Sequence, residues 1–203
     1  LKGVIPSDVK ISSIRQEDAL GLGHAISCAE HLLRDEPFAV LLPDEYLLPD
    51  KDFLDLREMV KNFNTQGIGQ ILLEKIGSKE VSNFGIVNMK KKSKELNERI
   101  QINDLVEKPK KSKNKINYRI VGRYILTPEV IKILKKEKPR VGKEIELTKA
   151  LQNFIEDNGR LDGFITNSKI FDCGSKKGFI GANIASAMKD KEMKKYVLKI
   201  LEI

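Results

Sequence analysis

An acidic pair follows the most hydrophobic run of this 203-residue sequence. The run covers residues 38–42, and Pro43, Asp44 and Glu45 come directly after it. Continuous apolar runs of this length are typical of a central strand that is buried on both faces, and ligands of open α/β sheets bind beyond the carboxyl ends of the strands. A carboxylate there is well placed to hold a hard divalent cation, since Mg²⁺ takes oxygen ligands together with substrate phosphates. The alternative, in which Asp44 caps a turn and Glu45 is solvated, has equal weight on placement alone.

Two further stretches place charged side chains at predicted strand ends. In DLVEKPK, Glu107 and Lys108 come just after a strand pattern, where the acid can accept a bond from a sugar hydroxyl and the lysine can neutralise a phosphate. In KIFDCGSKKG, Asp172 leaves a short strand and offers a second carboxylate to a cation held at Asp44. The simpler alternatives are a solvated turn ion pair for Glu107 and Lys108 and a helix-entry role for Asp172.

The elements that must position these residues alternate along the chain between strand and helix patterns. The predicted strands cover residues 9–14, 38–42, 69–75, 84–89, 100–106, 119–126, 161–166 and 169–171. The predicted helices begin near residue 21 and at residues 127–129, and cover 54–62, 146–155, 178–188 and 191–203. Strands that alternate with helices predict a mostly parallel, layered α/β sheet with an antiparallel excursion, without an internal repeat or a domain linker.

Charge and composition bear on the possible partners. The net charge is +8, and 29 of the 37 basic residues are lysines, with no tryptophan in the chain. Base readout relies on bidentate arginine and single-strand binding on aromatic platforms, so solvated lysine-rich loops at 90–94 and 108–115 explain the charge better than nucleic acid does. No apolar run is long enough to cross a membrane, and the two cysteines lack CxxC spacing. These features predict a cytoplasmic protein with reduced thiols and without a nucleic-acid or membrane partner.

Seven motifs occur in the order and spacing of one enzyme family. They are GLGHA, FAVLLPDE, FGIV, LVEKPK, VGRYILTPE, EIELT and FDCGSKKG, and together they span essentially the whole chain. The sequence therefore resembles the bacterial UTP–glucose-1-phosphate uridylyltransferases, also called UDP-glucose pyrophosphorylases. The resemblance implies a Rossmann-like nucleotidyltransferase fold in one domain over residues 1–203, with C-terminal helices at 178–203 and without its first strand or strands. It also implies the Mg²⁺-assisted reaction of UTP with glucose 1-phosphate to give UDP-glucose and pyrophosphate.

The resemblance implies roles for three charged residues. Asp44 matches the family's magnesium ligand, and Asp172 matches the second carboxylate that faces the metal. Lys108 matches the lysine that grips the sugar phosphate. Asp44 and Lys108 are therefore expected to support catalysis.

The resemblance also implies contacts to the base and to the sugar. Gln16 and the backbone of Gly21 match the loop that recognises uracil. Gly85, Glu107 and the backbone near Val121 match the glucose-binding positions.

The sequence departs from the family pattern in three places. Asp44 and Glu45 stand where the commonest form has two aspartates, which leaves the role of Glu45 open. Lys149 stands where family members often have Asp, which excludes an acidic function there. The family begins with a strand, a G-x-G-T-R loop and a downstream lysine, and none of these occurs here. We therefore expect either a truncated polypeptide or an N-terminal part that is not included in this sequence.

Other functions stay open at this point. A sister enzyme with another nucleotide or sugar 1-phosphate would share most of the motifs. A non-catalytic module that binds nucleotide sugars is the alternative of a different class, and a nucleic-acid binder is the third. The C-terminal helices offer apolar residues either for core packing or for a homo-oligomer, a dimer or a tetramer. These residues are Ile180, Ile184, Met188, Tyr196, Leu198 and Leu201.

Overall fold

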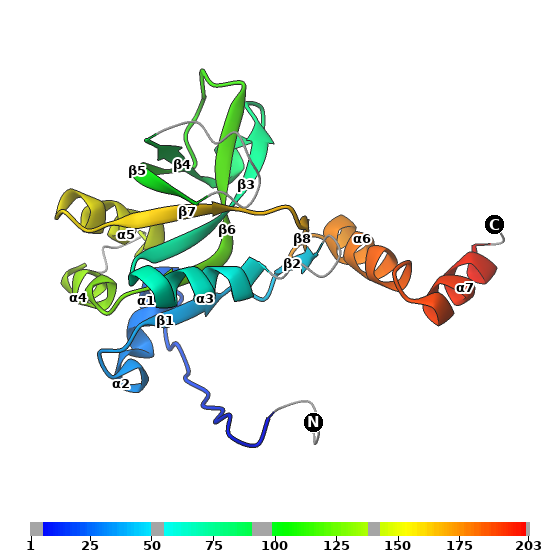
Figure 1. Cartoon of the computed structure of the whole chain (residues 1–203), viewed down its shortest axis with the longest axis horizontal. Helices are drawn as coiled ribbons and strands as arrows, with labels where there is room; N and C mark the ends of the chain where they lie inside the picture. The colour runs from blue at the N-terminus through cyan, green and yellow to red at the C-terminus, as the bar shows by residue number, and fades with distance from the viewer. Residues whose placement is uncertain (1–5, 50–54, 91–98, 138–142, 202–203) are drawn as a thin grey trace.

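The computed structural model describes residues 6–49, 55–90, 99–137 and 143–201 of the chain. In these ranges a six-stranded sheet forms the body of the molecule, and a two-stranded sheet leads from it to a pair of C-terminal helices (Figure 1). None of the helices in the described ranges is long and apolar enough to cross a membrane. The cytoplasmic location expected from the sequence stays a prediction.

Six strands form the large sheet. They are β1 (Phe38–Leu41), β3 (Gly69–Gly77), β4 (Gly85–Met89), β5 (Arg99–Glu107), β6 (Ile116–Leu126) and β7 (Leu161–Ile165). Their order in the sheet is β1-β6-β3-β7-β5-β4, and β4 also pairs with β6. The pairings from β6 through β3, β7, β5 and β4 therefore close into a ring. The long apolar strand β6 pairs with β3 and β4 within that ring, and it also pairs with β1 outside it.

The large sheet is mixed. β1, β3, β4 and β7 run in one direction, whereas β5 and β6 run in the other. Every pairing of this sheet that includes β5 or β6 is therefore antiparallel. The β3–β7 pairing includes neither strand and is parallel. The predicted α/β fold with a mixed, helix-flanked sheet is confirmed. The expectation of a mostly parallel sheet is wrong, because β5 and β6 run opposite to the strands beside them and leave β3–β7 as the one parallel pairing of the described strands.

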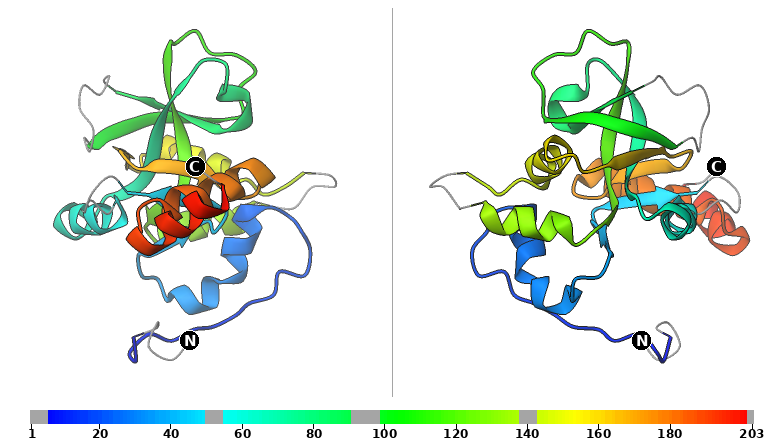
Figure 2. Two further views of the ribbon diagram at one scale, coloured as in Figure 1. Left: turned by 90° about the vertical axis from the view of Figure 1, so that its right-hand side faces the viewer. Right: turned by 60° about the vertical axis from the view of Figure 1, so that its left-hand side comes forward.

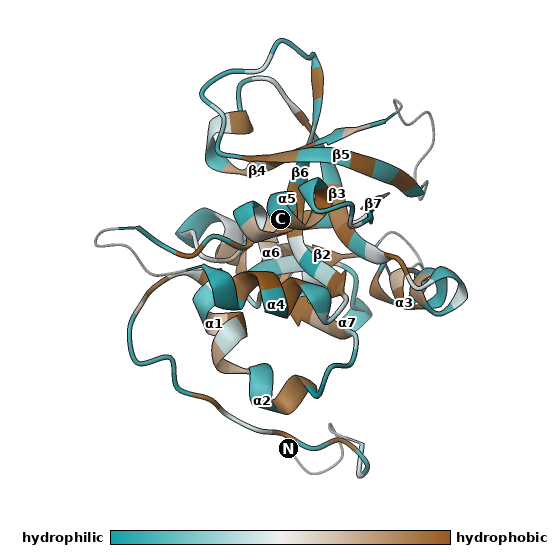
Figure 3. Ribbon diagram, turned by 90° about the vertical axis from the view of Figure 1, so that its left-hand side faces the viewer, coloured by the Kyte–Doolittle hydropathy of each residue, from teal (hydrophilic) through white to brown (hydrophobic). Residues whose placement is uncertain are grey.

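Helices cover both faces of the large sheet. They are α1 (Leu22–Cys28), the short α2 (Glu30–Leu33), α3 (Asp55–Gln66), α4 (Glu129–Lys136) and α5 (Leu147–Glu156), with a 3₁₀ turn at Val81–Asn83. Helices α1, α4 and α5 pack on one face, and α3 packs on the other. In β3, Ile71 and Leu73 join the cluster under α4 and α5, whereas Leu72 joins Met59 of α3. This alternation is the period of two that a strand imposes, and Figure 3 shows it as alternating hydrophobic and hydrophilic residues along β5.

A second sheet holds together two segments that lie more than 120 residues apart in the chain. Strands β2 (Glu45–Leu48) and β8 (Lys169–Asp172) pair antiparallel, with Glu45 opposite Asp172. The amide of Cys173 then donates to the carbonyl of Asp44 at 2.6 Å, which extends the pairing by one step. The two acidic segments singled out in the sequence therefore lie side by side.

The two C-terminal helices lie at the end of the molecule away from α4 and α5 (Figures 1 and 2). Helix α6 (Lys176–Ala187) packs on β2 and β8, and α7 (Lys191–Ile200) packs mainly on α6. Side-chain caps fix both helix starts, since Ser175 accepts from an amide of α6 and Asp190 accepts from two amides of α7. Many apolar side chains of these helices are exposed, namely Phe179, Ile180, Ile184, Met188, Met193, Tyr196, Ile200 and the following Leu201.

Two expectations about strands are wrong. Residues 9–14 form no strand, because Val9 and Ile11 are exposed and no described strand pairs with this segment. The run at 38–42 is not a central strand among the described residues, since β1 pairs with β6 alone and Leu41 is 49% exposed. The other predicted strands and helices are confirmed, with ends that shift by a few residues. The predictions for residues 54, 91–94 and 202–203 lie outside the described residues.

Candidate functional site

Most of the predicted site residues gather around one pocket. The pocket has a volume of about 390 Å³ and lies between the large sheet, the β2–β8 sheet and the start of α5. The predicted residues that line it are Asp44, Gly85, Glu107, Lys108 and Asp172. The fold therefore brings together four motifs that are far apart in the sequence.

Asp44 and Asp172 border the same small space. A methyl group on Gly174 would lie 3.1 Å from Asp172 Oδ1 and 4.0 Å from Asp44 Oδ2, so the glycine leaves room between the two carboxylates. The amide of Gly174 also donates to Asp172 Oδ1 at 3.0 Å. Within the described ranges, no group of three or more His, Cys, Asp or Glu side chains gathers to hold a metal ion. A pair of carboxylates suits Mg²⁺, which usually completes its shell with waters and substrate phosphates.

The charge of the pocket also favours a cation. Two lining residues are basic, Lys108 and Arg119. Six are acidic, namely Asp44, Glu45, Glu107, Glu144, Glu146 and Asp172. A surface with this excess of carboxylates repels a polyphosphate unless a cation neutralises it. The side chains present therefore fit a divalent cation that binds together with a phosphate-bearing ligand.

Among the pocket residues of β4 and β5, Gly85 opens a space next to polar side chains. Gly85 and Glu107 are partners across the β4–β5 pairing. A methyl group on Gly85 would lie 3.1 Å from Glu107 Oε2 and 3.4 Å from Thr148 Oγ1. A carboxylate and a hydroxyl can both bond to sugar hydroxyls. Tyr124 also lines the pocket, and burial, with the nearby charges of Glu45 and Glu107, raises the pKa of its phenol, so the hydroxyl stays neutral.

Lys108 combines a fixed backbone with an exposed side chain that pairs with Glu107. Its φ of 43° lies in the left-handed region, and its amide donates to the carbonyl of Phe84 at 3.1 Å. Its Nζ lies 3.7 Å from Glu107 Oε1, and its side chain is 63% exposed. Such backbone conformations are uncommon for residues with a Cβ and cluster at functional sites. The backbone of Lys108 is therefore held in place, and its exposed ammonium group is able to reach a phosphate in the pocket.

The predicted base-binding residues lie beside the pocket rather than in its wall. Gln16 Nε2 donates to the carbonyl of Gly21 at 3.1 Å and lies 2.9 Å from His24 Nδ1. Gly21 has a φ of 93°, and a methyl group on it would lie 2.7 Å from Cβ of Glu144, which lines the pocket. Only glycine fits this close approach with this backbone.

Val121 points away from the pocket. Its side chain is fully buried in the cluster under α3, whereas its neighbours Ile120 and Gly122 line the pocket. Any contact of Val121 with a ligand is therefore made through the backbone, as the sequence resemblance implies.

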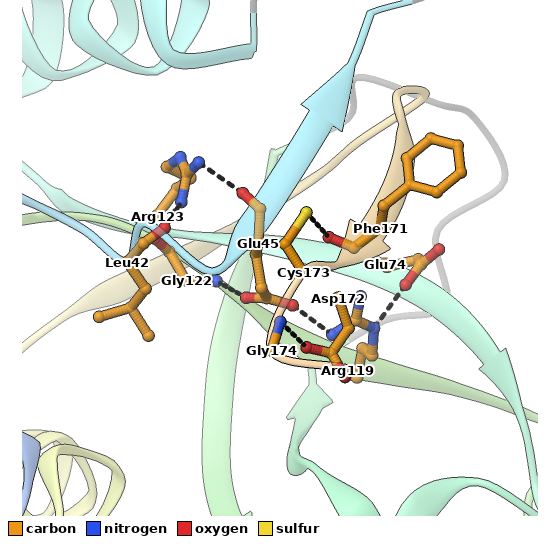
Figure 4. Close-up of polar contacts among 10 residues, drawn as sticks. All are labelled: Leu42, Glu45, Glu74, Arg119, Gly122, Arg123, Phe171, Asp172, Cys173 and Gly174. Atoms are coloured by element: carbon orange, nitrogen blue, oxygen red, sulfur yellow. Dashed lines mark hydrogen bonds and ion pairs between the residues drawn. The ribbon is translucent and has the colours of Figure 1, made fainter. Parts of the chain in front are cut away.

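Arg119 is a pocket residue that sequence reasoning missed. It is 6% exposed and lies over the ring of Phe84, at 4.4 Å from the ring centroid. Its guanidinium donates to Glu45 at 2.6 Å and to Glu74 (Figure 4). Burial lowers the pKa of Arg119, but the hydrogen bonds and charges of Glu74 and Glu45 outweigh burial and leave the pKa raised. An arginine within the apolar run of β6 was the available signal, because a buried cation needs partners.

Glu45 is bonded on both of its carboxylate oxygens. Oε1 accepts from Arg119, and Oε2 accepts from the amide of Gly122 (Figure 4). Arg123 adds two further bonds to the same turn, to the carbonyl of Leu42 at 2.6 Å and to the carbonyl of Glu45 at 2.7 Å. No local sequence pattern indicates these contacts, since they join residues more than 70 positions apart.

Comparison with known proteins identifies relatives of this chain. The family model for the nucleotidyl transferases matches residues 3–189. The UTP–glucose-1-phosphate uridylyltransferase of Haemophilus ducreyi is 32% identical over 208 residues, which cover 100% of this chain and 69% of that protein. The protein of the same name from Escherichia coli K12 is 36% identical over 185 residues, which cover 90% of this chain and 60% of that protein.

Solved structures agree with these relatives. A UTP-bound UGPase from Acinetobacter baumannii matches with a TM-score of 0.88 and 30% identity, covering 100% of this chain and 69% of that one. A UDP-glucose pyrophosphorylase complexed with UDP-glucose matches with a TM-score of 0.78 and 34% identity, covering 88% of this chain and 66% of that one. The chain thus spans between 60% and 69% of the length of these relatives. It belongs to the nucleotidyl transferase family, among the UTP–glucose-1-phosphate uridylyltransferases.

Proposed function

We propose that the chain carries the activity of a UTP–glucose-1-phosphate uridylyltransferase, which makes UDP-glucose and pyrophosphate from UTP and glucose 1-phosphate. The observation that carries the proposal is the lining of one pocket, which brings the Asp44–Asp172 pair together with Gly85, Glu107 and Lys108. The relatives support it, because their solved structures include one with UTP and one with UDP-glucose.

The chemistry needs charge and position more than a base. A phosphate oxygen of glucose 1-phosphate forms a bond to the α-phosphorus of UTP while the bond from that phosphorus to the α–β bridging oxygen breaks, and pyrophosphate leaves. The attacking oxygen is already an anion, so no proton has to be removed. Transfer of this kind depends on alignment and on neutralised phosphate charge.

We assign the pocket side chains to these tasks. Lys108 holds the phosphate of glucose 1-phosphate, and Glu107 accepts from a glucose hydroxyl in the space that Gly85 leaves. Asp44 and Asp172 hold Mg²⁺, which supplies neutralisation of the triphosphate charge when it is bound. Proton uptake is not required of any of these groups.

We assign uracil to the loop beside the pocket. Gln16 and the backbone of Gly21 are the proposed contacts, supported by the packing of Gly21 on the pocket residue Glu144. The backbone near Val121 is the proposed third contact to the sugar, because Ile120 and Gly122 line the pocket.

We also propose that the chain is one nucleotidyltransferase domain whose C-terminal helices bind a second copy of the chain. Phe179, Ile180, Tyr196 and Ile200 are each more than half exposed on α6 and α7, which lie away from the main core (Figure 1). Light scattering of the purified chain should give the mass of a dimer or a tetramer. Tyr196→Glu should lower that mass, and a monomeric parent would overturn this assignment.

The test of the activity begins with binding. UDP-glucose is titrated calorimetrically into the chain with and without Mg²⁺, with ADP-glucose as the control ligand. We expect UDP-glucose to bind, to bind more tightly with Mg²⁺, and to be preferred over ADP-glucose. Release of pyrophosphate from UTP and glucose 1-phosphate is then measured with the same protein.

Matched variants connect the result to the pocket. Lys108→Ala should weaken binding of glucose 1-phosphate, whereas Lys110→Ala, an exposed lysine of the same loop outside the pocket lining, should leave it unchanged. Tighter binding of dTDP-glucose or of another nucleotide sugar would overturn the proposal in favour of a sister enzyme. Absence of binding to all nucleotide sugars would overturn it altogether.

A further inference from the structure

Glu45 lies where three parts of the pocket meet. It is the first residue of β2, directly follows Asp44 in the chain, and faces Asp172 across the β2–β8 pairing. Its side chain leaves this small sheet and bonds to β6 of the large sheet through Gly122 and Arg119. Its carboxylate is therefore a direct side-chain link between the Asp44 turn and the body of the molecule.

The same link reaches the lysine side of the pocket. The guanidinium of Arg119 that binds Glu45 also lies over the ring of Phe84, at 4.4 Å from the ring centroid. The carbonyl of Phe84 accepts the amide of Lys108 at 3.1 Å. A continuous series of contacts thus runs from the Asp44 turn, through Glu45 and Arg119, to the backbone that carries Lys108.

The contacts of Glu45 disfavour a role as a third metal ligand. One oxygen lies 2.6 Å from the cationic Arg119, and the other accepts the amide of Gly122. A divalent ion at this carboxylate would have to displace a guanidinium of like sign that is 6% exposed and has little room to move. Both oxygens are instead used to fix the turn.

We propose that Glu45 is a positioning residue, whose bonds to Gly122 and Arg119 set the placement of Asp44 against Asp172 and against the Lys108 side of the pocket. A carboxylate is required because it accepts from both donors and balances the charge of Arg119. The consequence for metal and substrate binding rests on the proposed function. The structural consequence does not, so the two can be tested separately.

The test of the structural consequence needs no substrate. Amide hydrogen exchange of Gly122 and Cys173 is measured by NMR, because these two amides bond to Glu45 and to the carbonyl of Asp44. In Glu45→Gln, the N–H₂ group of the new side chain must face one of the two donors, Arg119 or the amide of Gly122. We therefore expect the amide protons of Gly122 and Cys173 to exchange at least about tenfold faster than in the parent. Glu45→Asp keeps the charge but has a shorter side chain, so it should also speed the exchange of the Gly122 amide proton. This second variant provides the test even if Glu45→Gln does not fold.

Glu74→Gln is the matched control. Glu74 binds the other side of Arg119 and touches neither the turn nor Gly122 by any bond among the described residues. This substitution should leave the exchange rates of the Gly122 and Cys173 amide protons within about threefold of the parent's, since the bonds of Glu45 remain. Exchange at Cys173 that is unchanged in both Glu45 variants would overturn the proposal.

Ligand binding then tests the consequence for the metal site. In Glu45→Gln, the gain in UDP-glucose affinity that Mg²⁺ produces should shrink by about tenfold, while the affinity measured without Mg²⁺ changes less. Glu45→Asp should restore part of this Mg²⁺ effect, because aspartate keeps the negative charge but its side chain is shorter than that of glutamate. A full Mg²⁺ effect in Glu45→Gln would overturn the positioning role. A parent that binds no UDP-glucose would refute the proposed function and leave the exchange result as the test of Glu45.

Discussion

Gly122→Ala is expected to disturb the stability of the fold and the Asp44 turn together. The added methyl group would lie 2.6 Å from Cβ of Leu42, where ordinary contacts begin at 3.4 Å. Rotation of the Leu42 side chain cannot remove this clash, because Cβ is attached to the backbone. The backbone itself is held by the 2.8 Å bond from the amide of Leu42 to the carbonyl of Gly122.

The size of the effect follows from two contributions. Overpacking of this kind costs about 1–3 kcal/mol. Movement of Gly122 also weakens the bond from its amide to the charged Glu45, and bonds to charged groups contribute about 1.5–3 kcal/mol. Because the two effects share one backbone shift and are not additive, we expect the free energy of unfolding to fall by about 2–4 kcal/mol. A domain with about 5–15 kcal/mol of stability still folds after such a loss.

Urea unfolding followed by circular dichroism measures this loss. With a urea slope of about 1–3 kcal/mol per M, the midpoint should fall by at least about 0.7 M. Gly77→Ala is the control, since a methyl group there meets only the end of Glu80 at 3.7 Å, and its midpoint should stay near that of the parent. A Gly122→Ala midpoint as high as that of Gly77→Ala would refute the close contact between β6 and the Leu42 backbone.

Lys108→Ala and Asp44→Ala should each lower pyrophosphate release by about a hundredfold or more with the fold kept, and turnover within about tenfold of the parent would contradict both assignments. Arg119→Met removes the shared partner of two carboxylates and should lower the free energy of unfolding by about 3 kcal/mol in urea; a change below about 1 kcal/mol would show that the pair is not coupled to the fold. A hydrogen bond from Thr127 lowers the pKa of Glu129, so its stabilisation is present above the ordinary carboxyl pKa and is lost as pH falls through the lowered native value. Unfolding midpoints of the parent and Glu129→Gln should therefore converge at acid pH, and a gap that widens on acidification would be evidence against that hydrogen bond.

The sequence predicted most elements because their patterns are local. The apolar run of β6 and the helical spacing of α5 need no partner to be recognised, and both were found. Pairing is not local, which is why β1 was expected at the centre of the sheet although it pairs with β6 alone among the described strands. Residues 9–14 show the converse, since a strand-like composition forms no strand where none of the described strands pairs with it.

The candidate site divides in the same way. Asp44, Glu107 and Asp172 were found because each follows a recognisable strand, and all three line the pocket. The role of Glu45 was left open and Arg119 was missed, because the bond that joins them spans more than 70 residues. No role was assigned to Arg119 from the sequence, whereas the structure shows its guanidinium in contact with two carboxylates and an aromatic ring.

The pairing of β2 with β8 also decides when the site comes into existence. Closing a loop of more than 120 residues costs about 2 kcal/mol more conformational entropy than closing one of ten. Such long-range pairings form late in folding. On the ribosome, Asp44 emerges well before the strand that carries Asp172 has been synthesised. A nascent chain therefore lacks the completed Asp44–Asp172 pair until translation has passed β8.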